Sequence, residues 1–241
     1  MAPENVFTED ELAEMGTPIV EQVYSAIDKG ENDKPAKLVR RMYKEWSAMH
    51  NIYRDWITAL LSFIGEHYGD EELQEALKYS CASWFKPVVE LCEKCDREGD
   101  IRRKAEIVAT GIKAHLMPMR VIEDEEKFIF EPQPCGSGGL LVQEGYYDLP
   151  DGFLRIKNPQ PMTCGKSDFP VYCAHAPIMT MLAIEWTGAP VLIEDPSDSI
   201  GEKPCRIYVY KNPKDCPEDF YLKVGKKKNI QNVDVSKSGD A

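Results

Sequence analysis

The feature that most constrains this chain is a long run of apolar residues at three- and four-residue spacing in its first third. Between residues 37 and 67 the spacing holds over about eight turns of helix, at Val39, Met42, Tyr43, Trp46, Met49, Tyr53, Trp56, Ile57, Leu60, Leu61 and Ile64. Such spacing places apolar side chains on one face of an α-helix. We therefore expect a long helix over residues 37–67, with Trp46 and Trp56 packed in a core.

Two further helices are expected after this one. The next begins near Asp70, which can cap it, and Pro87 is expected to kink it. Its inward stripe is predicted to be Leu73, Leu77, Cys81, Trp84, Val88, Leu91, Cys92 and Cys95. Cys92 and Cys95 have the spacing of half a zinc knuckle, but core packing is the simpler interpretation on a helix face. A third helix is expected over residues 101–115.

After residue 118 the pattern changes from helix to strand. Short strands are predicted at residues 121–122 and 128–130, on either side of a charged turn, and at residues 190–195 and 205–211. A helix is expected over residues 176–187. The predicted fold class is α+β, with a helical N-terminal half packed on a cysteine-bearing antiparallel sheet domain.

The sequence also suggests a division into parts. Residues 1–34 are an acidic N-terminal extension that ends in the turn-forming stretch DKGENDKP. Residues 35–225 are expected to form a single α+β domain, made of a helical part at 35–118 and a cysteine-rich part at 119–225. Residues 226–241 form a polar tail.

Charge and composition exclude several classes of function. A net charge of −12 repels phosphate backbones, so nucleic acid is not expected as a partner. No stretch of about 18 uncharged apolar residues exists, and no basic start precedes an apolar run, so neither a membrane span nor a secretory signal is expected. We expect a cytoplasmic protein whose eight cysteines are reduced and serve packing, metal binding or thiol chemistry.

One segment carries a resemblance to a known family. Residues 172–210, YCAHAPIMTMLAIEWTGAPVLIEDPSDSIGEKPCRIYVY, contain a cysteine before an amphipathic helix, a glycine, a short strand ending in acid, and a Gly-x-x-x-Cys turn into a last strand. This segment resembles the closing part of vinyl-reductase-type ligand-binding domains, which include the sensor halves of phenol-responsive bacterial activators. The L-2-amino-thiazoline-4-carboxylic acid hydrolase family has a similar helical front and cysteine-bearing back.

The resemblance implies a zinc site. In the phenol sensors, the cysteine before the helix, the acid at the strand end and two cysteines around the final turn hold the ion. Matched to this sequence, the ligands are Cys173, Asp195 or its neighbour Glu194, and Cys205. The remaining cysteine position falls near Asp198, so this sequence departs from the pattern at the fourth ligand. His175 could supply a nitrogen instead. Without the resemblance, both thiols are equally well explained as core residues.

Two more cysteines are candidates for catalysis. Cys135 lies in PCGSGG, where glycine amides could form an anion-binding nest that lowers the pKa of the thiol. The alternative is a plain hairpin loop without chemistry. Cys164 lies beside Lys166, whose charge would favour the thiolate, as a metal ligand or as a nucleophile.

These features lead to three functional hypotheses. The first is a zinc-dependent enzyme, a hydrolase or lyase, that acts on a small organic compound of heterocyclic or aromatic character. The apolar residues proposed to line its pocket are Met162, Met179, Met181 and Trp186. The second is a small-molecule-binding or sensing module with a structural zinc ion. The third is a structural protein whose cysteines only pack. A second copy of the chain, in a homodimer, is a further partner to consider.

Overall fold

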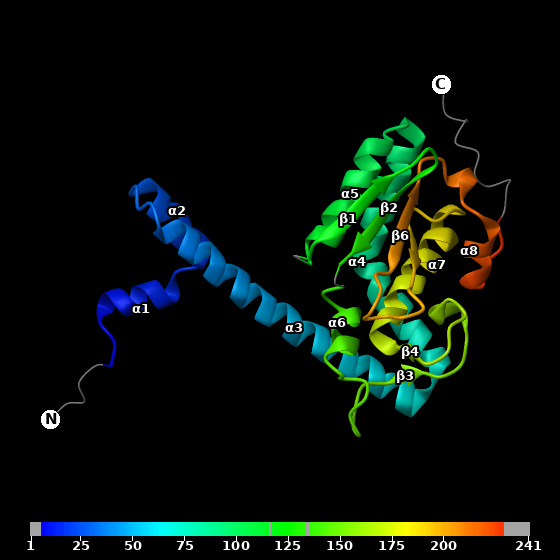
Figure 1. The fold of residues 1–241 in the computed structure, drawn as a ribbon, viewed down its shortest axis with the longest axis horizontal. Coiled ribbons are helices and arrows are strands. Elements are labelled where there is room, and N and C mark those ends of the chain that lie inside the picture. The colour runs from blue at the N-terminus through cyan, green and yellow to red at the C-terminus, as the bar shows by residue number, and fades with distance from the viewer. Residues whose placement is uncertain (1–5, 116, 134, 229–241) are drawn as a thin grey trace. The chain divides into compact units, whose positions relative to one another are not determined.

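The computed structural model describes residues 6–115, 117–133 and 135–228 (Figure 1). Its helices and strands confirm the α+β class. The helices are α1 (Glu9–Gly16), α2 (Ile19–Asp28), α3 (Lys34–Tyr68), α4 (Asp70–Glu98), α5 (Ile101–Lys113), α6 (Gly138–Gln143), α7 (His175–Thr187) and α8 (Glu218–Lys223). The strands are β1 (Met119–Glu123), β2 (Lys127–Pro132), β3 (Arg155–Ile156), β4 (Phe169–Pro170), β5 (Ile193–Asp195) and β6 (Arg206–Tyr210). Three short 3₁₀ helices are η1 (Pro161–Thr163), η2 (Val171–Ala174) and η3 (Pro213–Asp215).

The chain divides into two compact units, Met1–Trp56 and Ile57–Ala241. The division lies inside the continuous helix α3, whereas the sequence suggested one near residue 34. The turn residues before residue 34 do end a helix, because α2 stops at Asp28 and α3 begins at Lys34. They therefore lie between two helices, as a break in the chain at this point predicts.

The first unit is helical and nearly without a core. A capping box begins α1: the Glu11 backbone N–H donates to Thr8 Oγ1 at 3.3 Å, and the Thr8 N–H donates to the Glu11 carboxylate at 2.8 Å. Among the described residues of this unit, only Ala26 and Leu38 are buried apolar side chains. The prediction that Trp46 and Trp56 are core residues is wrong, since both are exposed.

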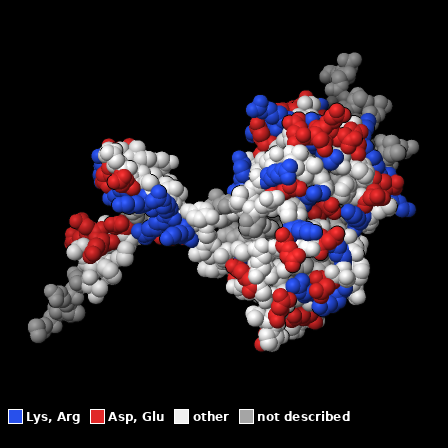
Figure 2. Space-filling model, viewed as in Figure 1, with Lys and Arg blue, Asp and Glu red and all other residues white. Residues whose placement is uncertain are grey.

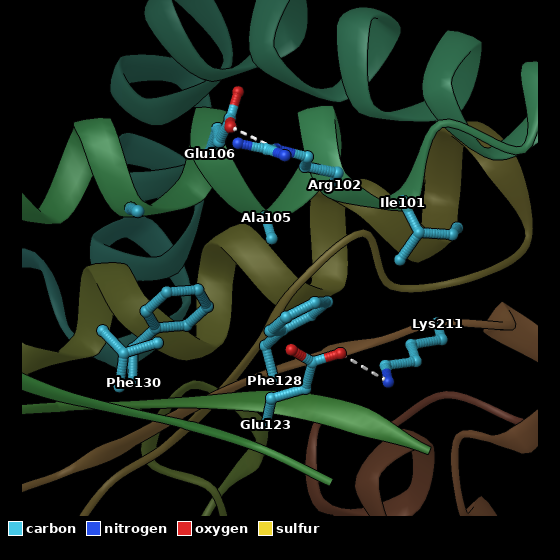
Figure 3. A pocket seen from close by; sticks show the side chains of 10 residues that line it. Ile101, Arg102, Ala105, Glu106, Glu123, Phe128, Phe130 and Lys211 are labelled. Atoms are coloured by element: carbon cyan, nitrogen blue, oxygen red, sulfur yellow. Dashed lines mark hydrogen bonds and ion pairs between the residues drawn. The ribbon is translucent and has the colours of Figure 1, made fainter. Parts of the chain in front are cut away.

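The second unit is built on a four-stranded antiparallel sheet in the order β1-β2-β6-β5, with β3 and β4 paired separately. Side chains alternate along a strand, and directly opposed residues share a face. The register therefore places Phe128, Phe130, Ile207 and Val209 on one face, and Figure 3 shows the two phenylalanines turned toward α5. On the other face, the Tyr208 ring lies 5.4 Å from the ring of Phe220 in α8.

The core lies between this sheet and the helices α4, α5 and α7. The buried line on α4 consists of Leu73, Leu77, Cys81, Phe85, Val89, Cys92 and Cys95. The residues from Leu73 to Val89 in this line are four residues apart, and a row with this spacing winds obliquely around a helix. Phe85 is therefore buried, and the prediction that Trp84 and Leu91 face the core is wrong, because each is more than half exposed.

A buried ion pair joins α4 to α5. Lys104 Nζ lies 2.8 Å from Asp96 Oδ1, and the lysine side chain is 0% exposed. The same ammonium group donates to the Tyr210 carbonyl of β6 at 3.5 Å. One cation therefore links two helices and the sheet. No helix in the described part of the chain is both long and apolar enough to cross a membrane.

Candidate functional site

Three thiols and one carboxyl from four separate segments lie together in the second unit. Cys135 precedes α6, Cys173 lies in η2, Glu194 in β5, and Cys205 directly before β6. Burial raises the pKa of the Cys173 thiol well above its usual value, and the charges of Cys135, Cys205 and Glu194 raise it further. Burial likewise raises the pKa of Cys205 to about 11, with contributions from Cys135 and Glu194. These charge effects link Cys135, Cys173, Cys205 and Glu194, and we call these four side chains the thiol cluster. Asp195 also acts on Cys205, and the Arg155 cation lowers the pKa of Cys173.

The sheet register explains which acid joins the thiol cluster. Glu194 is directly opposite Ile207, and Cys205 lies two residues before Ile207, so Glu194 and Cys205 point to the same face. Asp195 is opposite Arg206 and points to the other face, where its carboxylate accepts from Lys223 Nζ at 3.0 Å. The register therefore favours Glu194 over Asp195 as the acid beside the thiols.

Two glycines at the start of α6 allow its backbone to pass directly over two of these thiols. A Cβ atom on Gly138 would lie 2.4 Å from Cys173 Sγ, and one on Gly139 would lie 2.8 Å from Cys135 Cβ. Both distances are too short for real atoms. The segment expected to be a loop or an anion nest is thus a helix start packed on sulfur, which independently places Cys135 and Cys173 close together.

Glu194 is partly buried and has no counter-charge among the described residues. Its backbone N–H donates to Thr180 Oγ1 at 3.4 Å, but its carboxylate has neither a hydrogen bond nor an ion pair within the described ranges of the chain. Burial raises the pKa of this carboxyl to about 7. A cation bound here would supply the missing charge.

The donor chemistry of the thiol cluster fits a thiophilic metal ion. Cysteine thiolates and a carboxylate are typical zinc ligands. The Ser197 backbone N–H also donates to Cys205 Sγ at 3.4 Å, a kind of contact that orients metal-bound ligands. In the structure as it stands, however, no three His, Cys, Asp or Glu side chains of the described residues are placed to hold one ion. Metal binding would have to remove thiol protons and draw the side chains inward.

Two of the other predicted ligands have different partners. His175 Nδ1 is hydrogen-bonded to the Tyr172 carbonyl at 2.6 Å, and burial lowers the pKa of this imidazole, which favours its neutral form. Asp198 is almost fully exposed and forms an ion pair with Lys166. The structure brings neither of them into the thiol cluster.

Cys164 has the surroundings of a structural thiol. It ends η1 in the left-handed conformation, with φ of 52°, and its Sγ lies 4.0 Å from the Glu194 carbonyl oxygen. Burial raises the pKa of this thiol to about 12, which disfavours the thiolate that a nucleophile needs. Lys166 does lower this pKa, as expected, but its effect is smaller than that of burial, and the same ammonium group pairs with Asp198.

Cys135, in contrast, lines a pocket. The pocket has a volume of about 320 Å³ and lies between the end of β2, the last residue of α6 and the turn before β6. Its lining residues are Pro132, Gln133, Cys135, Gln143, Gly201, Glu202, Lys203 and Pro204. Ser137, two residues from Cys135, has a buried hydroxyl without a hydrogen-bond partner. A small ligand in this pocket could therefore contact one member of the thiol cluster.

A larger and mostly apolar groove lies between α5 and the strands β1 and β2. Its volume is about 660 Å³, and Figure 3 shows Phe128 and Phe130 below Ala105, with the Arg102–Glu106 and Lys211–Glu123 pairs around them. No cysteine lines this groove. The predicted pocket residues Met162, Met179 and Met181 line neither cavity and are buried in the core.

Comparison with known proteins adds no assignment: no family model matches the chain, and neither a curated protein nor a solved structure does.

Proposed function

We propose that this chain is a zinc-dependent enzyme, a hydrolase or lyase, acting on a small heterocyclic or aromatic compound. Cys173, Cys205 and Glu194 would hold the ion, and Cys135, which lines the pocket, would lie near it. The observation that carries the proposal is the Glu194 carboxyl, which acts on Cys173 and Cys205, has no ion pair among the described residues and has a pKa that burial raises to about 7. A divalent ion would compensate the charges that this cluster develops when its protons leave.

Each residue of the site has a role within this proposal. When bound, zinc supplies Lewis acidity toward water or a carbonyl group. Metal binding would require the Glu194 carboxyl to lose its proton, which a pKa of about 7 in the metal-free protein permits at neutral pH. Cys135 contacts the substrate from the wall of the pocket. Cys164 supports this arrangement through its contact with the Glu194 carbonyl and takes no part in the chemistry.

A second candidate is a small-molecule-binding or sensing module with a structural zinc ion. It is favoured by the α5 groove, which is the larger and more apolar cavity. A ligand bound there would be surrounded by Phe128, Phe130 and Ala105 and would lie out of contact with every cysteine. Such a ligand would be bound but not converted.

Elemental analysis of the purified, reduced protein tests the metal site. We expect about one zinc ion per chain, lost in Cys173→Ser and in Cys205→Ser. The matched control is Cys95→Ser, which alters a buried cysteine of α4 outside the thiol cluster and should retain the metal. Metal-free wild-type protein that is fully folded, or retention of zinc by both cluster variants, would refute the zinc site.

A panel of small heterocycles and aromatic compounds then separates the two candidates. Turnover that disappears in Cys135→Ala, with zinc content unchanged, supports the enzyme. A ligand-induced rise in Tm without turnover, abolished by Ala105→Trp in the α5 groove, supports the sensing module instead. The free thiols that the site requires accord with the proposed cytoplasmic location, since all eight cysteines are unpaired.

A further inference from the structure

Helix α3 carries an apolar row that the described residues of the first unit leave largely exposed. The row consists of Val39, Met42, Trp46, Met49, Tyr53 and Trp56, each between 37 and 59% exposed. We call it the α3 seam. Leu60 and Phe63 continue the same spacing on α3 beyond residue 56 and are also exposed. Three of the six side chains are large aromatic rings, which are costly to leave in water.

The spacing within the α3 seam indicates what kind of surface it packs on. Its members are separated by three, four, three, four and three residues, an average of about 3.5, which is the heptad repeat of helices that wind around one another. A helix lying on a globular body needs only the broader 3.6-residue pattern. The seam is therefore suited to pair with another helix that carries the same repeat.

The exposed apolar surface of the α3 seam supplies a large part of a stable interface. Half of a large apolar side chain is on the order of 80 Å², so the six seam residues offer roughly 500 Å² per copy. A stable interface needs about 800 Å² per partner. The first unit also exposes Val6, Phe7, Leu12, Met15, Val20, Tyr24, Ile27, Tyr43 and Ile52, and those that lie beside the seam would add to this area.

We propose that two copies of the chain associate through the α3 seam. A second copy brings a helix of the same length and repeat, as a two-fold interface requires. It also brings complementary charge: Figure 2 shows acidic side chains gathered over α1 and basic ones over the first turns of α3. The acidic residues are Glu9, Asp10, Glu11 and Glu14, and the basic ones are Lys34, Lys37, Arg40, Arg41 and Lys44. Of the basic residues, Lys34 and Arg41 also pair within the chain with Glu31 and Glu45. A unit that carries both acidic and basic side chains can form ion pairs with a second copy of itself. This inference does not depend on the zinc site.

Sedimentation of the full chain tests the proposal. The wild type should have about twice the chain mass of 27.4 kDa. Met49→Glu, which places a charge in the α3 seam, should give a monomer with unchanged helical circular dichroism and unchanged zinc content. The matched control is Ala48→Glu, which adds the same charge at an exposed position of the same helix outside the seam and should remain a dimer.

A milder variant guards against a folding defect. Trp46→Ala should raise the dissociation constant of the dimer at least about tenfold, because aromatic residues at interface centres contribute most of the binding energy. A wild type that stays monomeric at about 100 µM would overturn the proposal and show that the chain covers its own seam. A Met49→Glu variant that remains dimeric would also overturn it.

Discussion

Two helices of this protein have similar apolar spacing in the sequence and very different surroundings in the structure. On α4, in the second unit, Leu77 and Phe85 are 2% and 1% exposed. On the part of α3 in the first unit, no member of the α3 seam is less than 37% exposed. Apolar periodicity therefore predicts a helix and the width of its apolar face, but it does not say whether the same chain or another one covers that face.

The largest expected effect comes from comparing a buried and an exposed aromatic residue at adjacent positions of α4. Phe85→Ala should lower the free energy of unfolding by about 3–5 kcal/mol, because it leaves a cavity in the core. Trp84→Ala, on the exposed side of the same helix, should cost less than about 1 kcal/mol. Urea unfolding followed by circular dichroism measures both. Equal losses at the two positions would contradict the burial pattern of α4.

A pair of glycines tests the close packing of α6 on the thiols. Gly138→Ala should destabilise the second unit by about 1–3 kcal/mol, because the new methyl group would collide with Cys173 Sγ. Gly111→Ala in α5 meets no atom within 4 Å and should instead stabilise by up to about 1 kcal/mol. Thermal unfolding of both variants provides the measurement, and a neutral Gly138→Ala would show that α6 does not lie on the cluster.

The Glu194 carboxyl should give the metal-free protein an unusual pH dependence. Its pKa rises from 4.5 to about 7 in the folded chain, so the folded state holds this proton over a range in which the unfolded state releases it. The free energy of unfolding should therefore fall as pH rises between about 4.5 and 7, by at most about 1.4 kcal/mol per pH unit. Tm recorded with a chelator across this range measures the effect.

Two glutamate variants isolate that contribution. Glu194→Gln cannot ionise, so its Tm should change less over this pH range and should exceed that of the metal-free wild type at pH 7.5. Glu45→Gln, on exposed α3 where Glu45 pairs with Arg41 at 2.8 Å, should retain the wild-type pH dependence. An unchanged pH dependence in Glu194→Gln would show that this carboxyl is ordinary.

The smallest effect is expected within the first unit. In protein dilute enough to be monomeric, Trp46→Ala should alter the free energy of unfolding by less than about 1 kcal/mol, since the ring is already exposed there. Urea titration at low concentration would detect a larger loss. Such a loss would mean that Trp46 packs within its own chain, and the contrast between the two units would then fail.

The sequence predicted the long helix of α3, the helices α4, α5 and α7 and the strands of the sheet, because these elements have clear periodicity. It did not predict α6, because glycine is a poor helix former. Gly138 and Gly139 occupy this helix because a larger side chain at either position would collide with Cys173 or Cys135. It named Asp195 before Glu194, since only the strand register tells which of two neighbouring acids faces the cysteines. That Cys135 joins Cys173 depends on contacts between distant segments, which no local pattern contains.

The buried pair of Lys104 and Asp96 has a consequence for how this protein can evolve. Loss of either charge alone would strand the other one in the interior, at a cost of about 3–5 kcal/mol. We therefore expect the two residues to be substituted together, by apolar residues of similar size, and not one at a time. In related sequences, Lys104 and Asp96 should either both be retained or both be replaced.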